Sequence, residues 1–475
     1  MLPQQRHDAS AQLALGWLVL ATAAVAASSL FAILIVMARV PGLGSLFPGT
    51  EFYRVALTLH VDLSQWVWFM AFAGMLWSLA ARRAPGAWDW TALALAALGA
   101  LLMAISPALG AIRPIMSNYM PVLDSPWFLA GLAIYGLAVL ISASAALADG
   151  PWRARAEANR DVSRGGHRAA GADVSNVSSS GRGSRNDVLQ LGLWLAAAVV
   201  LTALAVLAVT WWLLPASLSG HALFETLFWG PGHIWQFCLT TLMLLAWLAL
   251  CPPALSLPSA GRLKLLLLLG AMPALVAPLL LFLGPASGEY FAAFTRLMHW
   301  TSWEVPLLLG SVLLLLHWRS RVLPAVGLSL SVLLLVCGII LGTIIDGQTT
   351  LVTAHYHGTI GAVTLAFMGL TYGVLPVLGQ AMPPLPRIGL QLRLYGYGIL
   401  MMMSGLAGAG LMGAPRKMAG NVGVEFSVET VSRIFLGLGG SLATAGILMF
   451  LYLVLRQLWP GVALTLMAPS STGRK

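Results

Sequence analysis

The chain has 475 residues, of which 59% are hydrophobic and only 9% are charged. A chain this apolar must place most of its residues against lipid or other helices, which excludes a large soluble domain and indicates a polytopic membrane protein. The net charge of +10 does not indicate a nucleic-acid partner, because most Lys and Arg residues fall in loops on one side of the expected topology.

The cysteines carry no signal of a metal or disulfide framework. Cys238, Cys251 and Cys337 are scattered singly along apolar stretches, without a CxxC pair. Neither a disulfide scaffold nor a zinc or iron-sulfur site is indicated. We expect these three side chains to lie in the core.

Apolar runs long enough to cross a membrane recur along the whole chain. A spanning helix needs about 20 mainly apolar residues, and about twelve such runs are present. The sequence predicts spans at residues 12–37, 54–81, 90–112, 127–148, 190–214, 222–250, 263–284, 290–317, 324–345, 350–378, 392–413 and 430–456.

We expect one membrane domain interrupted by a linker. Residues 1–150 hold the first four predicted spans, and residues 188–475 hold the other eight. Residues 151–187 between them are rich in Ser, Gly and Arg and poor in large apolar side chains, so they are predicted to form a disordered cytoplasmic linker.

Charge asymmetry sets the expected orientation. With a cytoplasmic N-terminus, the inner loops are much richer in Lys and Arg than the outer ones. An even number of spans then returns the C-terminus to the cytoplasm. The first apolar run is too long for a cleavable signal peptide, so it is expected to be a retained span. The prediction is a multi-pass protein of the cell's inner (plasma) membrane.

Histidines on the spans are the natural candidates for a site, because ionisable side chains at membrane depth are costly and usually functional. Five lie there, each in the outer half of its span: His60, His233, His299, His355 and His357. A shared depth is what a layer of haem near one face of the membrane requires. His7, His221 and His317 lie at span ends or in a loop, where solvated or snorkelling roles explain them, and His167 lies in the linker.

His355 and His357 are two positions apart on one predicted helix. At 3.6 residues per turn they point about 200° apart, so one helix can reach two irons. Imidazole is a common axial haem ligand, and His60 is a suitable second ligand for a bis-His haem. The alternative is that each histidine only bonds a hydroxyl or carbonyl between helices.

Three motifs around these histidines resemble a known family. Leu57-Thr58-Leu59-His60, Phe228-Trp229-Gly230-Pro231-Gly232-His233 and Thr353-Ala354-His355-Tyr356-His357 are similar to motifs of subunit I of haem-copper oxidases. The likeness is greatest to B-type oxidases and the related nitric oxide reductases, and it covers nearly the whole chain. It implies an all-α integral membrane bundle of about twelve helices.

The resemblance also implies cofactors and ligands. His60 and His357 would ligate a low-spin haem, and His355 would ligate a high-spin haem. His233 would be one ligand of a non-haem metal, copper in oxidases and iron in nitric oxide reductases. Arg416 and Lys417, in an outer loop, are similar to the family's basic pair that binds haem propionates. Their alternative role is an ordinary interfacial basic loop.

The sequence departs from the family pattern in two places. The tyrosine that A- and B-type oxidases carry four residues after the motif histidine is absent, because Phe237 stands there. The family's adjacent histidine pair is missing from residues 279–284. His299 and Glu304 are offered as replacement ligands, a set that suits non-haem iron better than copper. Glu304 could instead be a buried proton carrier or an interhelical hydrogen-bonding group.

Three functions follow as hypotheses. The first is haem-dependent reduction of NO to N2O, with His233 and Glu304 catalytic. The second is a terminal oxidase that reduces O2 to water, and the third is a non-catalytic two-haem subunit for electron transfer or gas sensing. The sequence has no CxxCH motif and no copper-binding Cys cluster. Electrons must therefore come from a second subunit, carrying a cytochrome c or copper domain, or from a quinol.

Overall fold

The described chain is built almost entirely of helices. The computed structural model describes residues 3–37, 49–150, 179–323, 325–416 and 426–467. Within these residues, twelve helices are long and apolar enough to cross a membrane, and they coincide with the predicted spans. The prediction of an all-α, multi-pass membrane protein is thereby confirmed.

The chain divides into two compact units. The first comprises Met1–Trp17 and Phe69–Leu323, and the second comprises Leu18–Trp68 and Pro324–Lys475. Two segments pass from one unit to the other: the helix α1 (Pro3–Met37), and the continuous span that contains α2 (Gly49–Val61), the π-helical segment η2 (Asp62–Val67) and α3 (Trp68–Ala80).

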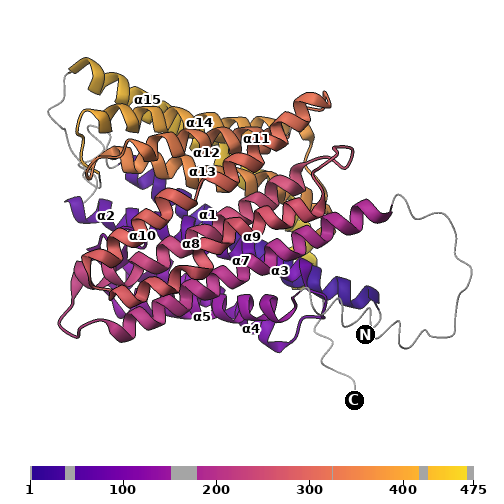
Figure 1. The fold of residues 1–475 in the computed structure, drawn as a ribbon, viewed down its shortest axis with the longest axis horizontal. Helices are drawn as coiled ribbons and strands as arrows, with labels where there is room; N and C mark the ends of the chain where they lie inside the picture. The colour runs from indigo at the N-terminus through magenta and orange to yellow at the C-terminus, as the bar shows by residue number, and fades with distance from the viewer. Residues whose placement is uncertain (1–2, 38–48, 151–178, 324, 417–425, 468–475) are drawn as a thin grey trace, which may run out of the picture. The chain divides into compact units, whose positions relative to one another are not determined.

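The first unit packs its helices in sequential pairs. Neighbours α4 and α5 lie against each other, as do α7 and α8, with α9 beside both α7 and α8 (Figure 1). Its further elements are α4 (Ala87–Ile105), η3 (Ser106–Leu109), β1 (Pro114–Ile115), β2 (Val122–Leu123), α5 (Pro126–Ala148), α7 (Ser179–Leu213), α8 (Gly220–Leu250), α9 (Ala260–Val276), η4 (Ala277–Leu283), α10 (Gly288–Thr301) and α11 (Glu304–Arg319).

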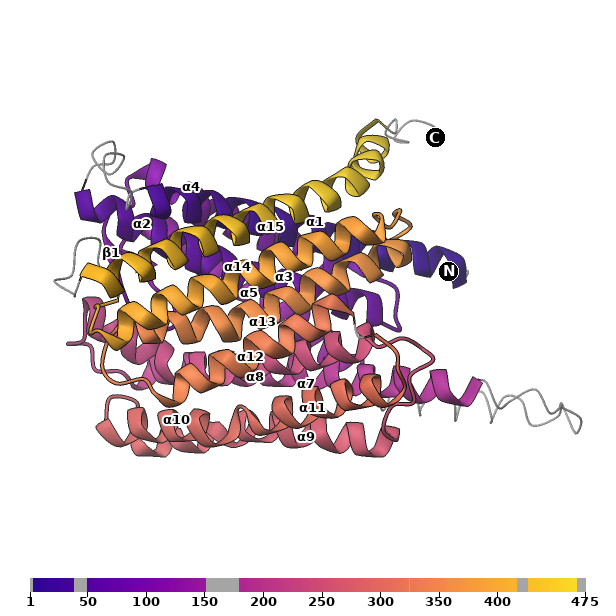
Figure 2. The same ribbon diagram turned by 90° about the horizontal axis from the view of Figure 1, so that it is seen from above.

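The second unit is centred on one helix. α13 lies between α12 and α14, and α15 packs along α14 (Figure 2). The elements are α12 (Val326–Thr343), α13 (Thr350–Val374), η5 (Leu375–Leu378), α14 (Leu385–Leu411) and α15 (Phe426–Met467). Because α13 carries both His355 and His357, its two neighbours on either side determine what those histidines can reach.

The start of α7 differs from the sequence prediction. The helix begins at Ser179, inside the stretch predicted to be a linker, while residues 151–178 with His167 lie outside the described residues. The polar residues at this end are held by neighbouring helix ends. The Arg185 guanidinium donates to the carbonyl of Cys251 at 2.9 Å, and the Gln190 amide donates to the carbonyl of Ala80 at 2.8 Å. Polar composition therefore did not prevent helix formation here.

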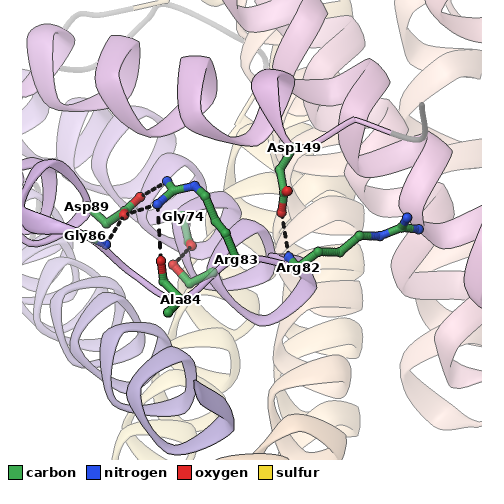
Figure 3. Close-up of polar contacts among 8 residues, drawn as sticks. Gly74, Arg82, Arg83, Ala84, Gly86, Asp89 and Asp149 are labelled. Atoms are coloured by element: carbon green, nitrogen blue, oxygen red, sulfur yellow. Dashed lines mark hydrogen bonds and ion pairs between the residues drawn. The ribbon is translucent and has the colours of Figure 1, made fainter. Parts of the chain in front are cut away.

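The loop between α3 and α4 is fixed by carboxylates (Figure 3). Arg83 donates to both oxygens of Asp89, at 2.6 and 2.5 Å, and these bonds with Asp89 raise the pKa of the Arg83 guanidinium. The buried Asp149 at the end of α5 accepts the backbone N–H of Arg82 at 2.5 Å. These contacts tie the ends of three helices together.

The eighth span is interrupted. The sequence predicts one helix over 290–317, but α10 ends at Thr301 and α11 begins at Glu304. Pro306 explains the break, since its ring has no N–H and clashes with the carbonyl four residues earlier, at Ser302. Glu304 consequently occupies the first turn of α11, where a negative charge is favourable.

Candidate functional site

The side chain of His60 is held by hydrogen bonds to one residue, Ser28. Its Nδ1 lies 2.9 Å from the hydroxyl oxygen of Ser28 and 3.1 Å from the Ser28 carbonyl oxygen, and the same hydroxyl donates to the His60 carbonyl at 2.9 Å. Because a carbonyl oxygen only accepts, the proton of the neutral imidazole must be on Nδ1. Nε2 therefore carries the lone pair, as a metal ligand requires.

His60 also stands at a change of helix type. α2 ends one residue later, at Val61, and a π-helical turn follows from Asp62. Such turns are rare and occur frequently at functional sites. Asp62 itself is buried at 1% exposure.

His355 is positioned by a close helix crossing. Its Nδ1 donates to the Gly338 carbonyl on α12 at 2.7 Å, and its ring lies over Gly342. A Cβ at Gly342 would lie 2.7 Å from Nδ1 and 2.9 Å from Cε1 of the imidazole. Gly338 and Gly342 form a GxxxG pattern, which allows helices to approach closely in membranes. The lack of side chains at these two positions of α12 thus makes room for the ring, and the bond to the Gly338 carbonyl fixes its tautomer.

His357 points to another side of α13. Its Nδ1 donates to the Thr353 carbonyl one turn earlier, at 2.8 Å, so its lone pair is also on Nε2. His60 and His357 belong to the same compact unit. That the two histidines ligate one haem stays a prediction.

Arg416, which follows α14 in the chain, lies beside the N-terminal end of α13. Its N–H donates to the Gln348 carbonyl at 3.1 Å, and the Thr350 N–H donates to the Ala414 carbonyl at 2.9 Å. These bonds place the half-buried Arg416 beside the N-terminal end of α13, the end that carries both histidines. The propionate-binding role of Arg416 stays a prediction. Lys417 lies outside the described residues.

His233 is enclosed by aromatic rings. It is 3% exposed, its Nδ1 donates to the Trp229 carbonyl at 2.7 Å, and its ring centroid lies 4.7 Å from that of Tyr119 and 5.6 Å from that of Phe294. Tyr119 comes from the loop between α4 and α5 and was not singled out from the sequence, because nothing in a sequence pattern links that loop to α8.

The proposed replacement ligands do not join His233. His299 and Glu304 are both exposed, and the described residues contain no group of three or more His, Cys, Asp or Glu side chains that could hold a metal ion. The break in the eighth span is the physical reason, because the pair was placed on one continuous helix. The expectation that Glu304 is buried is wrong.

His317 is another correction. A snorkelling or solvated role was expected, but the side chain is 1% exposed, with Nδ1 bonded to the Leu313 carbonyl at 2.8 Å. Its Nε2 has no hydrogen-bond partner among the described residues. Position at a span end did not predict exposure, since α8 and α9 pack against α11.

The residues present fit haem ligation. His60, His355 and His357 all use Nδ1 to bond a carbonyl and so direct the basic Nε2 outward, which is the arrangement found in metal-binding histidines. His355 and His357 do so from different sides of one helix.

Comparisons with known proteins agree with this fold. No family model matches the sequence. The chain is similar to an uncharacterized protein of Aquifex aeolicus, at 27% identity over 76% of this chain and 84% of that protein. It is also similar to an uncharacterized protein of Rickettsia prowazekii, at 22% identity over 93% and 95% of the two chains.

Among solved structures, the chain resembles a haem-copper terminal oxidase described as a dimer. The TM-score is 0.68 and the sequence identity 16%, covering 94% of this chain and 84% of that one. At this identity the likeness shows the fold alone. The fold of this protein is that of a haem-copper oxidase.

Proposed function

We propose that this protein is a haem-dependent membrane oxidoreductase that reduces NO to N2O. The observation that carries the proposal lies in the second unit, where His60, His355 and His357 each bond a carbonyl oxygen through Nδ1 and keep Nε2 basic, and where His355 and His357 leave α13 on different sides. Two haems, one low-spin and one high-spin, are the cofactors that this arrangement would hold.

The chain's own residues have distinct tasks in this proposal. His60 and His357 hold the electron-transferring haem, with Ser28 fixing the first of them. His355 holds the haem at which the gas reacts, and Arg416 binds propionates. A bound haem would supply an iron that changes its oxidation state. Electrons would come from a quinol or from a second subunit.

NO is proposed as the substrate in preference to O2 because of one residue on α8. Phe237, not tyrosine, stands one turn after His233 and is 2% exposed. Coupling two NO molecules to N2O consumes two electrons and two protons, whereas splitting O2 fully consumes four electrons. A chain without a tyrosine at this position of α8 is better suited to the smaller demand.

O2 is the second candidate because of Tyr119. Its ring centroid lies 4.7 Å from that of His233. In this candidate reaction, the phenol in contact with His233 would supply the further electron and proton that O2 reduction requires. This observation supports a terminal-oxidase reaction, although the tyrosine comes from a different element than the family pattern uses.

Metal content and gas turnover test the proposal together. We expect purified protein to contain two haems and to consume NO when a quinol and a chemical reductant that keeps it reduced are supplied. Consumption of O2 but not NO would establish the second candidate. Two haems without turnover of either gas would contradict both and indicate an electron-transfer subunit. Absence of haem would contradict all three.

A further inference from the structure

A carboxylate on α8 binds the loop that carries Tyr119. One oxygen of Glu225 accepts the backbone N–H of Asn118 at 2.8 Å, and the other accepts the side-chain amide of Asn118. The Glu225 side chain is 14% exposed, and the Nε2 atom of His221 lies 3.9 Å from it. A charge-assisted, two-point contact of this kind is directional and strong for its size.

The loop itself is shaped to present Asn118 and Tyr119. β1 and β2 pair antiparallel, with Ile115 opposite Val122, and the Ser117 hydroxyl donates to the Met120 carbonyl at 2.5 Å across the turn between them. The turn therefore behaves as one compact piece, and Glu225 determines where it rests on α8.

Tyr119 is accommodated by a glycine of the His233 motif. A Cβ at Gly232 would lie 2.6 Å from Cδ1 of the tyrosine, so only glycine allows the ring to lie this close to the helix. There the ring contacts His233, with an angle of 49° between the planes, and meets Trp229 edge-on at 5.8 Å. Tyr119 and Phe294 both pack against the imidazole and restrict its rotation.

We propose that Glu225 is a positioning residue for His233. By holding Asn118, it keeps Tyr119 over Gly232, and Tyr119 keeps the imidazole bonded to the Trp229 carbonyl with Nε2 in one direction. A side chain whose orientation is fixed by packing and hydrogen bonds in this way keeps its reactive atom in one place. The inference goes beyond the proposed function and depends only on the contacts around His233.

The test exchanges the partners of the hydrogen bonds. Glu225→Gln keeps one acceptor for Asn118 and loses the other, and Asn118→Asp places two carboxylates face to face. In the double variant, the new amide at position 225 can accept the backbone N–H of residue 118 and donate to the new carboxylate there, which restores both bonds. The readout is the rate at which diethyl pyrocarbonate modifies His233 in purified haem-loaded protein, measured by peptide mass spectrometry.

Both single variants should be modified about ten-fold faster or more, since opening of the loop exposes the ring, and the double variant should return toward wild type. Hydrogen exchange in residues 111–125 should follow the same order. These readouts do not require turnover, so failure of the gas assay alone leaves the positioning test intact.

Two control variants separate the contact between Glu225 and Asn118 from general effects of substitution on this unit. Glu289→Gln removes an exposed carboxylate of α10 in the same unit and should change nothing. His221→Ala removes a 63% exposed side chain 3.9 Å from Glu225 and should be nearly silent, because such pairs contribute little. Unchanged modification of His233 in both single variants would overturn the proposal, as would a double variant that folds but is no closer to wild type. If Glu225→Gln does not fold, Asn118→Ala provides the same test.

Discussion

At the scale of single residues, the position of one proton decides which histidines can bind iron. In His60, His355 and His357, a carbonyl oxygen 2.7–3.1 Å from Nδ1 requires the proton there, and Nε2 is left basic. The same arrangement occurs at His317, which is 1% exposed and has no partner for Nε2 among the described residues. Tautomer alone therefore does not make a site, and an accessible direction for Nε2 is also needed.

This leads to a prediction for the haem ligands. His60→Ala and His357→Ala should each abolish the same low-spin haem signal, because a bis-His iron loses its coordination when either ligand is removed. His355→Ala should remove the high-spin component and leave the low-spin one. Absorption and EPR spectra of the purified variants provide the measurement. The control is His221→Ala, because the His221 side chain is 63% exposed. A low-spin signal that survives in either of the first two variants would contradict the assignment.

Glu304 gives a second prediction at this scale. Since the side chain is exposed at the first turn of α11 and does not join His233, Glu304→Gln should leave gas turnover within about two-fold of wild type, as most surface substitutions do. The comparison requires NO and O2 consumption of both proteins at equal haem content. A large loss of NO consumption with unchanged haem spectra would restore Glu304 as a catalytic residue.

At the scale of helices, the site depends on local features of the backbone. Gly338 and Gly342 bring α12 close to α13, and Pro306 separates α10, which carries His299, from α11, which carries Glu304. Each is a local backbone effect, and each decides whether a histidine or carboxylate reaches the site.

We therefore expect Gly342→Ala to disturb one haem and not the other. The new Cβ would lie 2.7 Å from the Nδ1 atom of His355, so the ring must leave the Gly338 carbonyl, and the high-spin component should weaken or disappear. Gly373→Ala on α13 is the matched control, because no atom lies within 4 Å of the position that its Cβ would take. Absorption and EPR spectra of the two variants provide the measurement. Equal high-spin signals would show that the close approach of α12 to α13 does not position His355.

At the scale of the whole molecule, the orientation of the spans can be tested directly. Gly261 near the start of the seventh span and Gly288 at the start of the eighth both have open space around them, and the seventh span separates them. Positive-inside placement of Arg262 and Lys264 predicts that Gly261 is cytoplasmic. In intact cells, a membrane-impermeant maleimide should label Gly288→Cys and leave Gly261→Cys unlabelled, in a background without Cys238, Cys251 and Cys337. The reverse labelling would invert the topology.

The sequence by itself determined the membrane class, the twelve spans of the described chain, and the candidate ligands His60, His355 and His357. These follow from hydropathy and helical spacing, which are local properties of the chain. The GxxxG of Gly338 and Gly342 was also readable, but its consequence for His355 was not, because the partner lies on another helix.

Only the tertiary structure decided the rest. Ser28 lies 32 positions from His60, and Glu225 lies 107 positions from Asn118, and no periodicity connects residues so far apart. Burial of His317 and exposure of Glu304 likewise depend on which neighbouring helices cover them. Side-chain surroundings are set by packing between distant segments, so a pattern along one helix can name a ligand but cannot say what holds it in place.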